Sequence, residues 1–138
     1  MRVIGLDLGT KTLGISCSDI NQIIASAYKT INFNSDDYAN ALKELIKICE
    51  ELKPEKLVLG LPKNMDGTIG FQAKRSLDFK DMIEKEIDIE VVLIDERLTS
   101  KMANSLMIKA DMSRKKRKTK VDKIAATLIL QSYLDSRK

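Results

Sequence analysis

The fold is decided by residues 2–14, which read Arg-Val-Ile-Gly-Leu-Asp-Leu-Gly-Thr-Lys-Thr-Leu-Gly. The apolar residues Val3, Ile4 and Leu6 predict a short buried strand. A Gly-Thr turn follows, and residues 12–18 then predict an antiparallel return strand. The chain therefore begins with a hairpin whose first strand lies inside the sheet.

Asp7 interrupts the apolar run of this first strand. A carboxylate among apolar neighbours is costly to bury unless a cation or a donor compensates it. Glycines at 5, 9 and 14 let another element approach the backbone closely. Three interpretations follow: a metal-binding carboxylate of an RNase H-like nuclease, the phosphate loop of an actin- or sugar-kinase-like ATPase, or an ordinary hairpin with a capping Asp.

Length and composition narrow these interpretations. The chain has 138 residues, which predicts a single domain over 1–138, whereas the kinase-like ATPases close two such domains around a nucleotide. With 43% hydrophobic and 32% charged residues, the composition is that of a soluble globular protein. No apolar run approaches the ~20 residues of a membrane span, and the N-terminus lacks the form of a signal peptide. We expect a cytoplasmic protein without membrane contact.

The chain has no histidine and only two cysteines, Cys17 and Cys49. Neither cysteine has the spacing of a zinc site, so both are expected to be buried free thiols. Acid–base chemistry must therefore use carboxylates, lysines or metal-bound water.

The remaining pattern predicts an α/β fold. Its expected elements are a third antiparallel strand at 23–31, a helix at 38–52, a parallel strand at 56–62, a tight turn at Asp66-Gly67, a helix at 71–86, a parallel strand at 89–94, a helix at 98–110, a mobile basic loop at 111–120 and a last helix at 121–134. This order gives a mixed five-stranded sheet, three antiparallel strands followed by two parallel ones, with helices on both faces. It is the topology of the RNase H-like fold, which actin-like ATPases share as a repeated unit.

Carboxylates from distant positions should meet at one edge of this sheet. Asp7 is expected on the middle strand of the antiparallel meander, Asp95 and Glu96 at the end of the last strand, and Asp122 at the start of the last helix. Small residues at 125 and 126 would let that helix approach the sheet. Hard oxygen ligands without His or Cys suit Mg²⁺ or Mn²⁺, and two such ions promote phosphodiester hydrolysis.

Two of these assignments have structural alternatives. Neighbouring residues of a strand point to opposite faces, so Asp95 and Glu96 cannot both be ligands if the strand continues. Glu96 is favoured for its reach, which leaves Asp95 to cap or to pair with Arg97. Asp122 could instead be an acidic residue that favours the first turn of a helix.

Basic residues gather near the third carboxylate. Residues 113–120 contain six of them and no apolar residue. Such a run neutralises backbone phosphates, although it could also be only a solvated surface segment. With no Trp and few aromatic residues that look exposed, base stacking is not expected to be the main source of affinity. The predicted nucleic-acid contacts are Lys11, Lys63, Arg114, Lys115, Lys116, Arg117, Lys118 and Lys120.

Four ordered motifs resemble the YqgF family, whose members are also called RuvX. They are Gly-Leu-Asp-Leu-Gly-Thr-Lys-Thr-Leu-Gly at 5–14, Gly-Leu-Pro-Lys-Asn-Met-Asp-Gly-Thr at 60–68, Asp-Glu-Arg-Leu-Thr-Ser at 95–100 and Asp-Lys-Ile-Ala-Ala-Thr-Leu-Ile-Leu-Gln at 122–131. The resemblance implies a metal nuclease in which Asp7, Glu96 and Asp122 match the acidic triad. Phe71 departs from the polar or small residue expected there. Supporting roles are expected for Asp95, Thr10, Asn64 and Arg97.

These observations predict a metal-dependent nuclease with two Mg²⁺ or Mn²⁺ ions. The resemblance implies an RNA substrate in the processing of the 16S rRNA precursor, with the small-subunit precursor as a partner. One alternative is a Holliday junction resolvase acting on branched DNA. An alternative of another class is a non-catalytic nucleotide- or RNA-binding module. The protein is expected to be a monomer or a weak homodimer.

Overall fold

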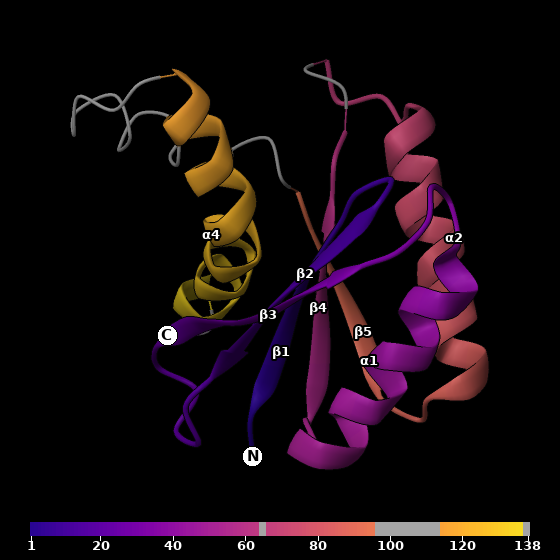
Figure 1. Ribbon diagram of the computed structural model, residues 1–138. Coiled ribbons are helices and arrows are strands. Elements are labelled where there is room, and N and C mark those ends of the chain that lie inside the picture. Colours follow the sequence, from indigo (N-terminus) through magenta and orange to yellow (C-terminus); the bar gives the residue numbers. More distant parts are fainter. Residues whose placement is uncertain (64–65, 96–113, 137–138) are drawn as a thin grey trace.

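A computed structural model describes the backbone of residues 1–63, 66–95 and 114–136, and the side chains of these ranges except 114–124. Its elements follow the predicted order (Figure 1). They are β1 (Val3–Leu8), β2 (Thr12–Ser18), β3 (Ala25–Asn32), α1 (Tyr38–Leu52), β4 (Lys56–Leu61), α2 (Phe71–Glu86), β5 (Glu90–Asp95) and α4 (Arg114–Ser136). The helix predicted at 98–110 lies outside the described residues.

The five strands form one mixed sheet in the order β3-β2-β1-β4-β5. β1 pairs antiparallel with β2 and parallel with β4, and β5 pairs parallel with β4. This confirms three antiparallel strands followed by two parallel ones. The expectation that Asp7 lies on the middle strand of the meander is wrong, because β2 holds that place. β1 is instead the central strand of the whole sheet, since it joins the antiparallel and parallel halves.

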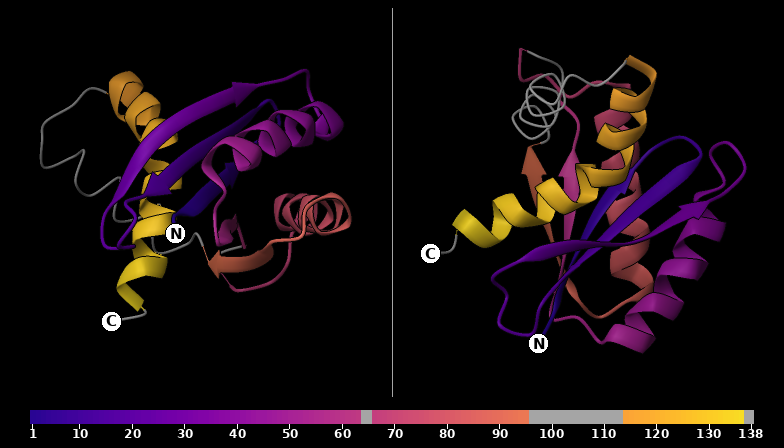
Figure 2. Two further views of the ribbon diagram at one scale, coloured as in Figure 1. Left: turned by 90° about the horizontal axis from the view of Figure 1, so that it is seen from below. Right: turned by 60° about the vertical axis from the view of Figure 1, so that its left-hand side comes forward.

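The two faces of the sheet are covered by different helices. Ile4, Leu6 and Leu8 of β1 belong to a core shared with α1 and α2, while Val3 packs with the apolar residues of α4. Figures 1 and 2 show α1 and α2 on one side of the sheet and α4 crossing the other side. Because side chains alternate along a strand, Gly5 and Asp7 share the α4 face with Val3.

Local sequence signals explain where the elements begin and end. The Asp37 carboxylate accepts a hydrogen bond from Asn40 N and caps α1, while Lys53 ends that helix in the left-handed conformation. β3 begins two residues later than predicted. The backbone amides of Ile23 and Ile24 donate to the Asp19 carboxylate at 2.7 and 2.9 Å, so these residues belong to the preceding turn.

The basic segment differs from its prediction as a mobile loop. Position 114 already starts α4, so most of the run is helical. Lys and Arg are good helix formers, and the segment has neither Gly nor Pro to stop a helix. The buried residues of the same helix, Ile129, Leu130, Tyr133 and Leu134, anchor its later turns against the sheet. A helix that is already nucleated extends at little cost.

Both cysteines are free, and Cys49 is buried while Cys17 is half-buried. Burial, with a smaller contribution from Glu50, raises the pKa of the Cys49 thiol to about 11. That thiol is therefore neutral at physiological pH. None of the described helices is both long and apolar enough to cross a membrane.

Candidate active site

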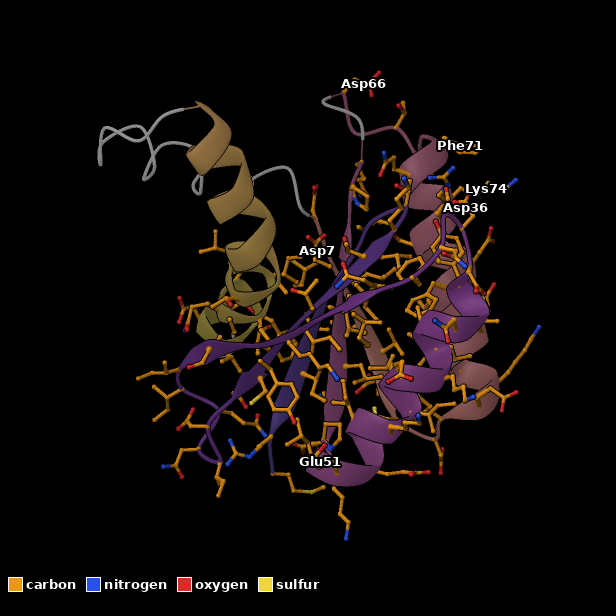
Figure 3. All side chains as sticks on the ribbon, in the orientation of Figure 1. Asp7, Asp36, Glu51, Asp66, Phe71 and Lys74 are labelled. Carbon is orange, nitrogen blue, oxygen red and sulfur yellow. The ribbon has the colours of Figure 1, made fainter. Side chains whose placement is uncertain are left out.

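Asp7 lies near the end of β1, on the face of the sheet that α4 covers (Figure 3). Its side chain is half-buried. Among the described residues, none donates a hydrogen bond to its carboxylate or forms an ion pair with it. Within the part of the chain that the structure describes, this carboxylate therefore lacks the compensation that burial normally requires. We call the edge at which β1, β4 and β5 end the carboxyl edge, and Asp7 is one residue from it.

Two residues without large side chains, Gly14 and Ala126, let α4 approach Asp7. A Cβ atom built on Gly14 would lie 3.5 Å from Cβ of Ala126 and 3.7 Å from Cβ of Asp7. Gly14 is the partner of Asp7 in the β1–β2 ladder. Ala126 of α4 and Asp7 of β1 therefore border the same small space above Gly14. This confirms the close approach of the last helix that Ala126 predicted.

A second close contact, between Gly5 and α4, lies one helical turn after Ala126, at Leu130. A Cβ atom on Gly5 would lie 2.7 Å from Cβ of Leu130 and 2.9 Å from the carbonyl oxygen of Ala126. The buried hydroxyl of Ser16 donates to that same carbonyl oxygen at 2.7 Å. Sequence reasoning missed Ser16, because a serine in a strand does not show which distant backbone group it binds. In the sequence, only its position between Ile15 and Cys17 indicated that Ser16 is buried.

The Gly5 contact gives a stability prediction with an internal control. Gly5→Ala should lower the free energy of unfolding by about 1–3 kcal/mol, because the methyl group would clash with the Ser16 hydroxyl and overpack against Leu130 and the Ala126 carbonyl of α4. Gly14→Ala, whose methyl group would meet only ordinary contacts, should cost less than about 1 kcal/mol. Urea unfolding of both variants measures the difference. Equal losses would contradict the close packing of α4 at Gly5.

Position 122 lies in the third turn of α4, because the helix starts at Arg114. The alternative that Asp122 is an acidic residue in the first turn of its helix is therefore wrong. Leu130 lies against Gly5, and Ala126 lies between Gly5 and Gly14. Continuing one more turn in this direction brings the helix backbone at 122 to the carboxyl edge, on the side of the helix that Ala126 presents to the sheet. The side chain at 122 is outside the described residues.

The alternation of side chains along β5 decides on which face of the sheet Asp95 lies. Ile94 packs with the α4 core, while Leu93 packs with the core under α1 and α2. Asp95 follows Leu93 by two residues and so belongs to the face opposite Asp7. In register, Ile94 pairs with Gly60, and the β1–β4 ladder extended by one residue sets Gly60 level with Asp7. Glu96 and Arg97 lie outside the described residues.

The β1–β2 turn contains Thr10 and Lys11, and backbone hydrogen bonds from the segment after β3 hold it in place. Phe33 N donates to the carbonyl oxygen of Lys11, and Asp36 N donates to that of Thr10, both at 2.9 Å. Thr10 is half-buried and the Lys11 side chain is exposed. The turn is thus held at the carboxyl edge with a cationic side chain free to meet an anion.

The segment after β4 also reaches the carboxyl edge. Lys63 is half-buried two residues beyond β4, and Asn64 lies outside the described residues. The tight turn predicted at Asp66-Gly67 is present, because Thr68 N and Thr68 Oγ1 both donate to the Asp66 carboxylate and Gly67 has φ 89°. Within the described side chains, no three Asp, Glu, Cys or His residues form a metal-binding group.

A family model described as RuvX, Holliday junction resolvase, matches residues 1–136. The chain belongs to the RuvX family. A relative from Clostridium acetobutylicum is 46% identical over 136 residues, covering 99% of each chain. One from Clostridium botulinum (strain Hall) is 48% identical over 136 residues, covering 99% of this chain and 98% of its own. Both carry the name pre-16S rRNA nuclease. As a RuvX member, the chain is a nuclease, a hydrolase that acts on ester bonds.

A solved structure supports the fold assignment. RuvC from T. thermophilus, in complex with a Holliday junction substrate, matches with a TM-score of 0.59 at 13% identity. The match covers 99% of this chain and 95% of RuvC. Such a likeness shows a common RNase H-like architecture, as the strand order predicts.

Proposed function

We propose that this chain is a divalent-metal-dependent nuclease whose ions are held by Asp7, Glu96 and Asp122. The observation that carries the proposal is the packing of α4 on β1 at Gly5 and Gly14, next to a half-buried Asp7 without a described partner. The same packing directs the α4 backbone toward the carboxyl edge at 122. Asp7 on β1 and position 122 on the α4 backbone are thus two of the proposed ligand positions, and position 96 directly follows β5, which β4 separates from β1.

The residues at this edge fit a hard divalent cation. Oxygen ligands without His or Cys favour Mg²⁺ or Mn²⁺ over zinc or copper. A pair of bound ions would supply an activated water and charge stabilisation for the leaving oxygen. The chain's own part is to hold carboxylates in fixed positions: Asp7 on a central strand, and position 122 on a helix fixed by Ser16. We propose that 1–138 acts as one catalytic domain in the cytoplasm.

The proposed substrate is RNA, specifically a precursor of 16S rRNA. The name shared by relatives of 46% and 48% identity supports this choice. The family description instead supports branched DNA as the second candidate. Symmetric cutting of a four-way junction normally needs two active sites, and therefore a dimer. We propose a monomer or weak homodimer, and the monomer, with one active site, is the form matched to cutting one strand.

A competition between substrates tests this proposal. The purified chain, with Mg²⁺ or Mn²⁺, would receive an end-labelled precursor of 16S rRNA and a labelled four-way DNA junction at equal concentration. We expect cleavage of the RNA at a defined position and slower or no cleavage of the junction. Paired symmetric cuts in the junction alone would favour the resolvase. Binding of either nucleic acid without any cleavage, under all metal conditions, would favour a non-catalytic binding module.

The basic start of α4 supports a polyanionic substrate. Cations near a helix N-terminus are opposed by the helix dipole, by about 0.3–1 kcal/mol each at low salt. Six basic residues nevertheless occupy positions 114–120, just before the proposed ligand at 122. A phosphate backbone at this helix end would offset that unfavourable charge. Lys11 and Lys63 add positive charge from the other side of the carboxyl edge.

Neutralising this helix start should flatten the salt dependence of binding. Replacing Arg114, Lys115, Lys116, Arg117 and Lys118 by Gln should lower the log–log salt slope by about 0.7 for each lost contact with a single strand. Fluorescence anisotropy in chelator, from low to high salt, measures it. The matched control replaces five lysines of or just after α1 and α2 by Gln, namely Lys43, Lys47, Lys53, Lys80 and Lys85. Equal slopes in both variants would mean that the basic run is only a solvated surface.

A further inference from the structure

Phe71, the first residue of α2, presents its aromatic ring to solvent. Its side chain is 71% exposed, more than that of any other large apolar residue that the structure describes. Ile69, two residues earlier, is 51% exposed. The buried face of α2 consists instead of Ala73, Ser76, Phe79 and Ile83. The ring therefore contributes nothing to the core.

The guanidinium of Arg75 packs on the Phe71 ring. The Arg75 guanidinium lies 4.3 Å from the centroid of the Phe71 ring, one helical turn later on the same side of α2. Arg75 also approaches the Asp36 carboxylate at 3.5 Å. The hydroxyl of Tyr38 donates to that carboxylate at 3.1 Å, so Asp36 is itself held in place. We call this arrangement the Phe71–Arg75 platform.

The Phe71–Arg75 platform is tied to the candidate active site through the backbone. Asp36, in the left-handed conformation with φ 62°, donates its N–H to the carbonyl oxygen of Thr10. Thr10 belongs to the turn that directly follows β1 and Asp7. Figure 3 shows Phe71, Lys74 and Asp36 together beside the upper part of the sheet, with Asp66 above them and Glu51 at the far end. The exposed Lys74 adds a cation beside the ring.

We propose that the Phe71–Arg75 platform binds an unpaired nucleobase of the substrate strand by stacking. The inference rests on the proposed nuclease function and narrows its substrate class to nucleic acid with single-stranded character near the cut. An aromatic face accepts any base, and the exposed Lys74 beside it is placed to meet a neighbouring phosphate, while Arg75 stays on the ring and paired with Asp36. The expectation that base stacking contributes little changes accordingly, since Phe71 is an exposed aromatic residue that composition alone did not reveal.

Fluorescence of a single introduced tryptophan tests the contact directly, because the chain has no Trp. In chelator, so that no strand is cut, single-stranded RNA should quench Phe71→Trp in a saturable way. Tyr28→Trp is the matched control. Tyr28 is 38% exposed and lies beside Glu51, at the other end of the molecule, and its emission should not change. Equal emission changes in the two variants would overturn the proposal.

Affinity measurements separate stacking from simple apolar contact. Phe71→Ala and Phe71→Leu should each bind single-stranded RNA about tenfold to a hundredfold more weakly, while Phe71→Tyr should bind as the wild type does. Binding to a duplex of the same sequence should change less than about twofold, because its bases are already stacked. An oligonucleotide with one abasic nucleotide should reproduce the loss at one position of the strand.

The outcomes also distinguish this proposal from the function it rests on. Suppose that the wild type shows metal-dependent cleavage and that Phe71→Ala binds single-stranded RNA as tightly as the wild type. This result would overturn the stacking site and leave the proposed nuclease function standing. A change in oligomeric state on sedimentation without a change in affinity would assign Phe71 to self-association and would likewise overturn it. A wild-type chain that binds no nucleic acid would overturn both.

Discussion

Asp7→Asn should lower the single-turnover rate of RNA cleavage by roughly a hundredfold to a thousandfold or more, on the scale known for the loss of one electrostatic contact to a transition state. The substitution keeps the shape of the side chain and removes the charge that a divalent ion requires. The fold should remain intact, because Asp7 has no hydrogen bond or ion pair with the described residues. The melting temperature should stay equal or rise, since the lost charge is half-buried and has no partner among the described side chains.

A second carboxylate at the same edge serves as the control for Asp7. Asp95 ends β5 on the opposite face of the sheet, so Asp95→Asn should keep far more activity than Asp7→Asn and should chiefly lower stability. Glu96→Gln should resemble Asp7→Asn. If Asp95→Asn reduced cleavage more than Glu96→Gln does, the assignment of Asp95 to the face opposite Asp7 would be wrong.

Asp122→Asn should also reduce cleavage by a hundredfold or more while leaving the fold nearly unchanged. Asp and Asn have similar helix propensities, so the free energy of unfolding should change by about 1 kcal/mol or less. Loss of the carboxylate removes a ligand on the α4 side, and with it charge stabilisation of the leaving oxygen. Substrate affinity in chelator should persist or rise, because one negative charge near the phosphates has gone.

The control for Asp122 is an exposed aspartate inside another helix. Asp81→Asn in α2 makes the same chemical change away from the carboxyl edge and should leave cleavage, affinity and melting temperature unaltered. Full activity of Asp122→Asn would return that residue to a structural role. The role of a first-turn acidic residue is already excluded, because α4 starts eight residues earlier, at Arg114.

Much of the sheet was predictable because its signals are local. The apolar run around Asp7 and the small residues at 5, 14 and 126 together predicted a carboxylate beneath a closely packed helix. Each of these signals lies within a few residues of the element that it describes. The start of α4 was not predictable in this way. A run of Lys and Arg is compatible with loop and helix alike, and the apolar residues that stabilise the helix come later in the chain.

The contacts that fix the site join residues far apart in the sequence. Ser16 is 110 residues from the Ala126 carbonyl that it binds. The Phe71–Arg75 platform depends on Asp36, which lies on a loop between β3 and α1. The chain has three Phe residues, and composition alone does not show that Phe33 and Phe79 are buried while Phe71 is exposed. Helical spacing predicts Phe79 on the inner face of α2, and the packing of α2 on the sheet leaves the Phe71 ring in solvent.

The proposed reaction is cleavage of RNA by divalent ions that acidic residues hold at the carboxyl edge. The most direct measurement is the single-turnover cleavage rate of a labelled 16S rRNA precursor as Mg²⁺ or Mn²⁺ is titrated into chelator-treated protein, with Asp7→Asn in parallel. We expect no cleavage in chelator, a rate that rises and saturates with added metal in the wild type, and little or no cleavage by Asp7→Asn at any metal concentration. Cleavage by the wild type in chelator, or equal rates for the two proteins at saturating metal, would contradict the proposed reaction.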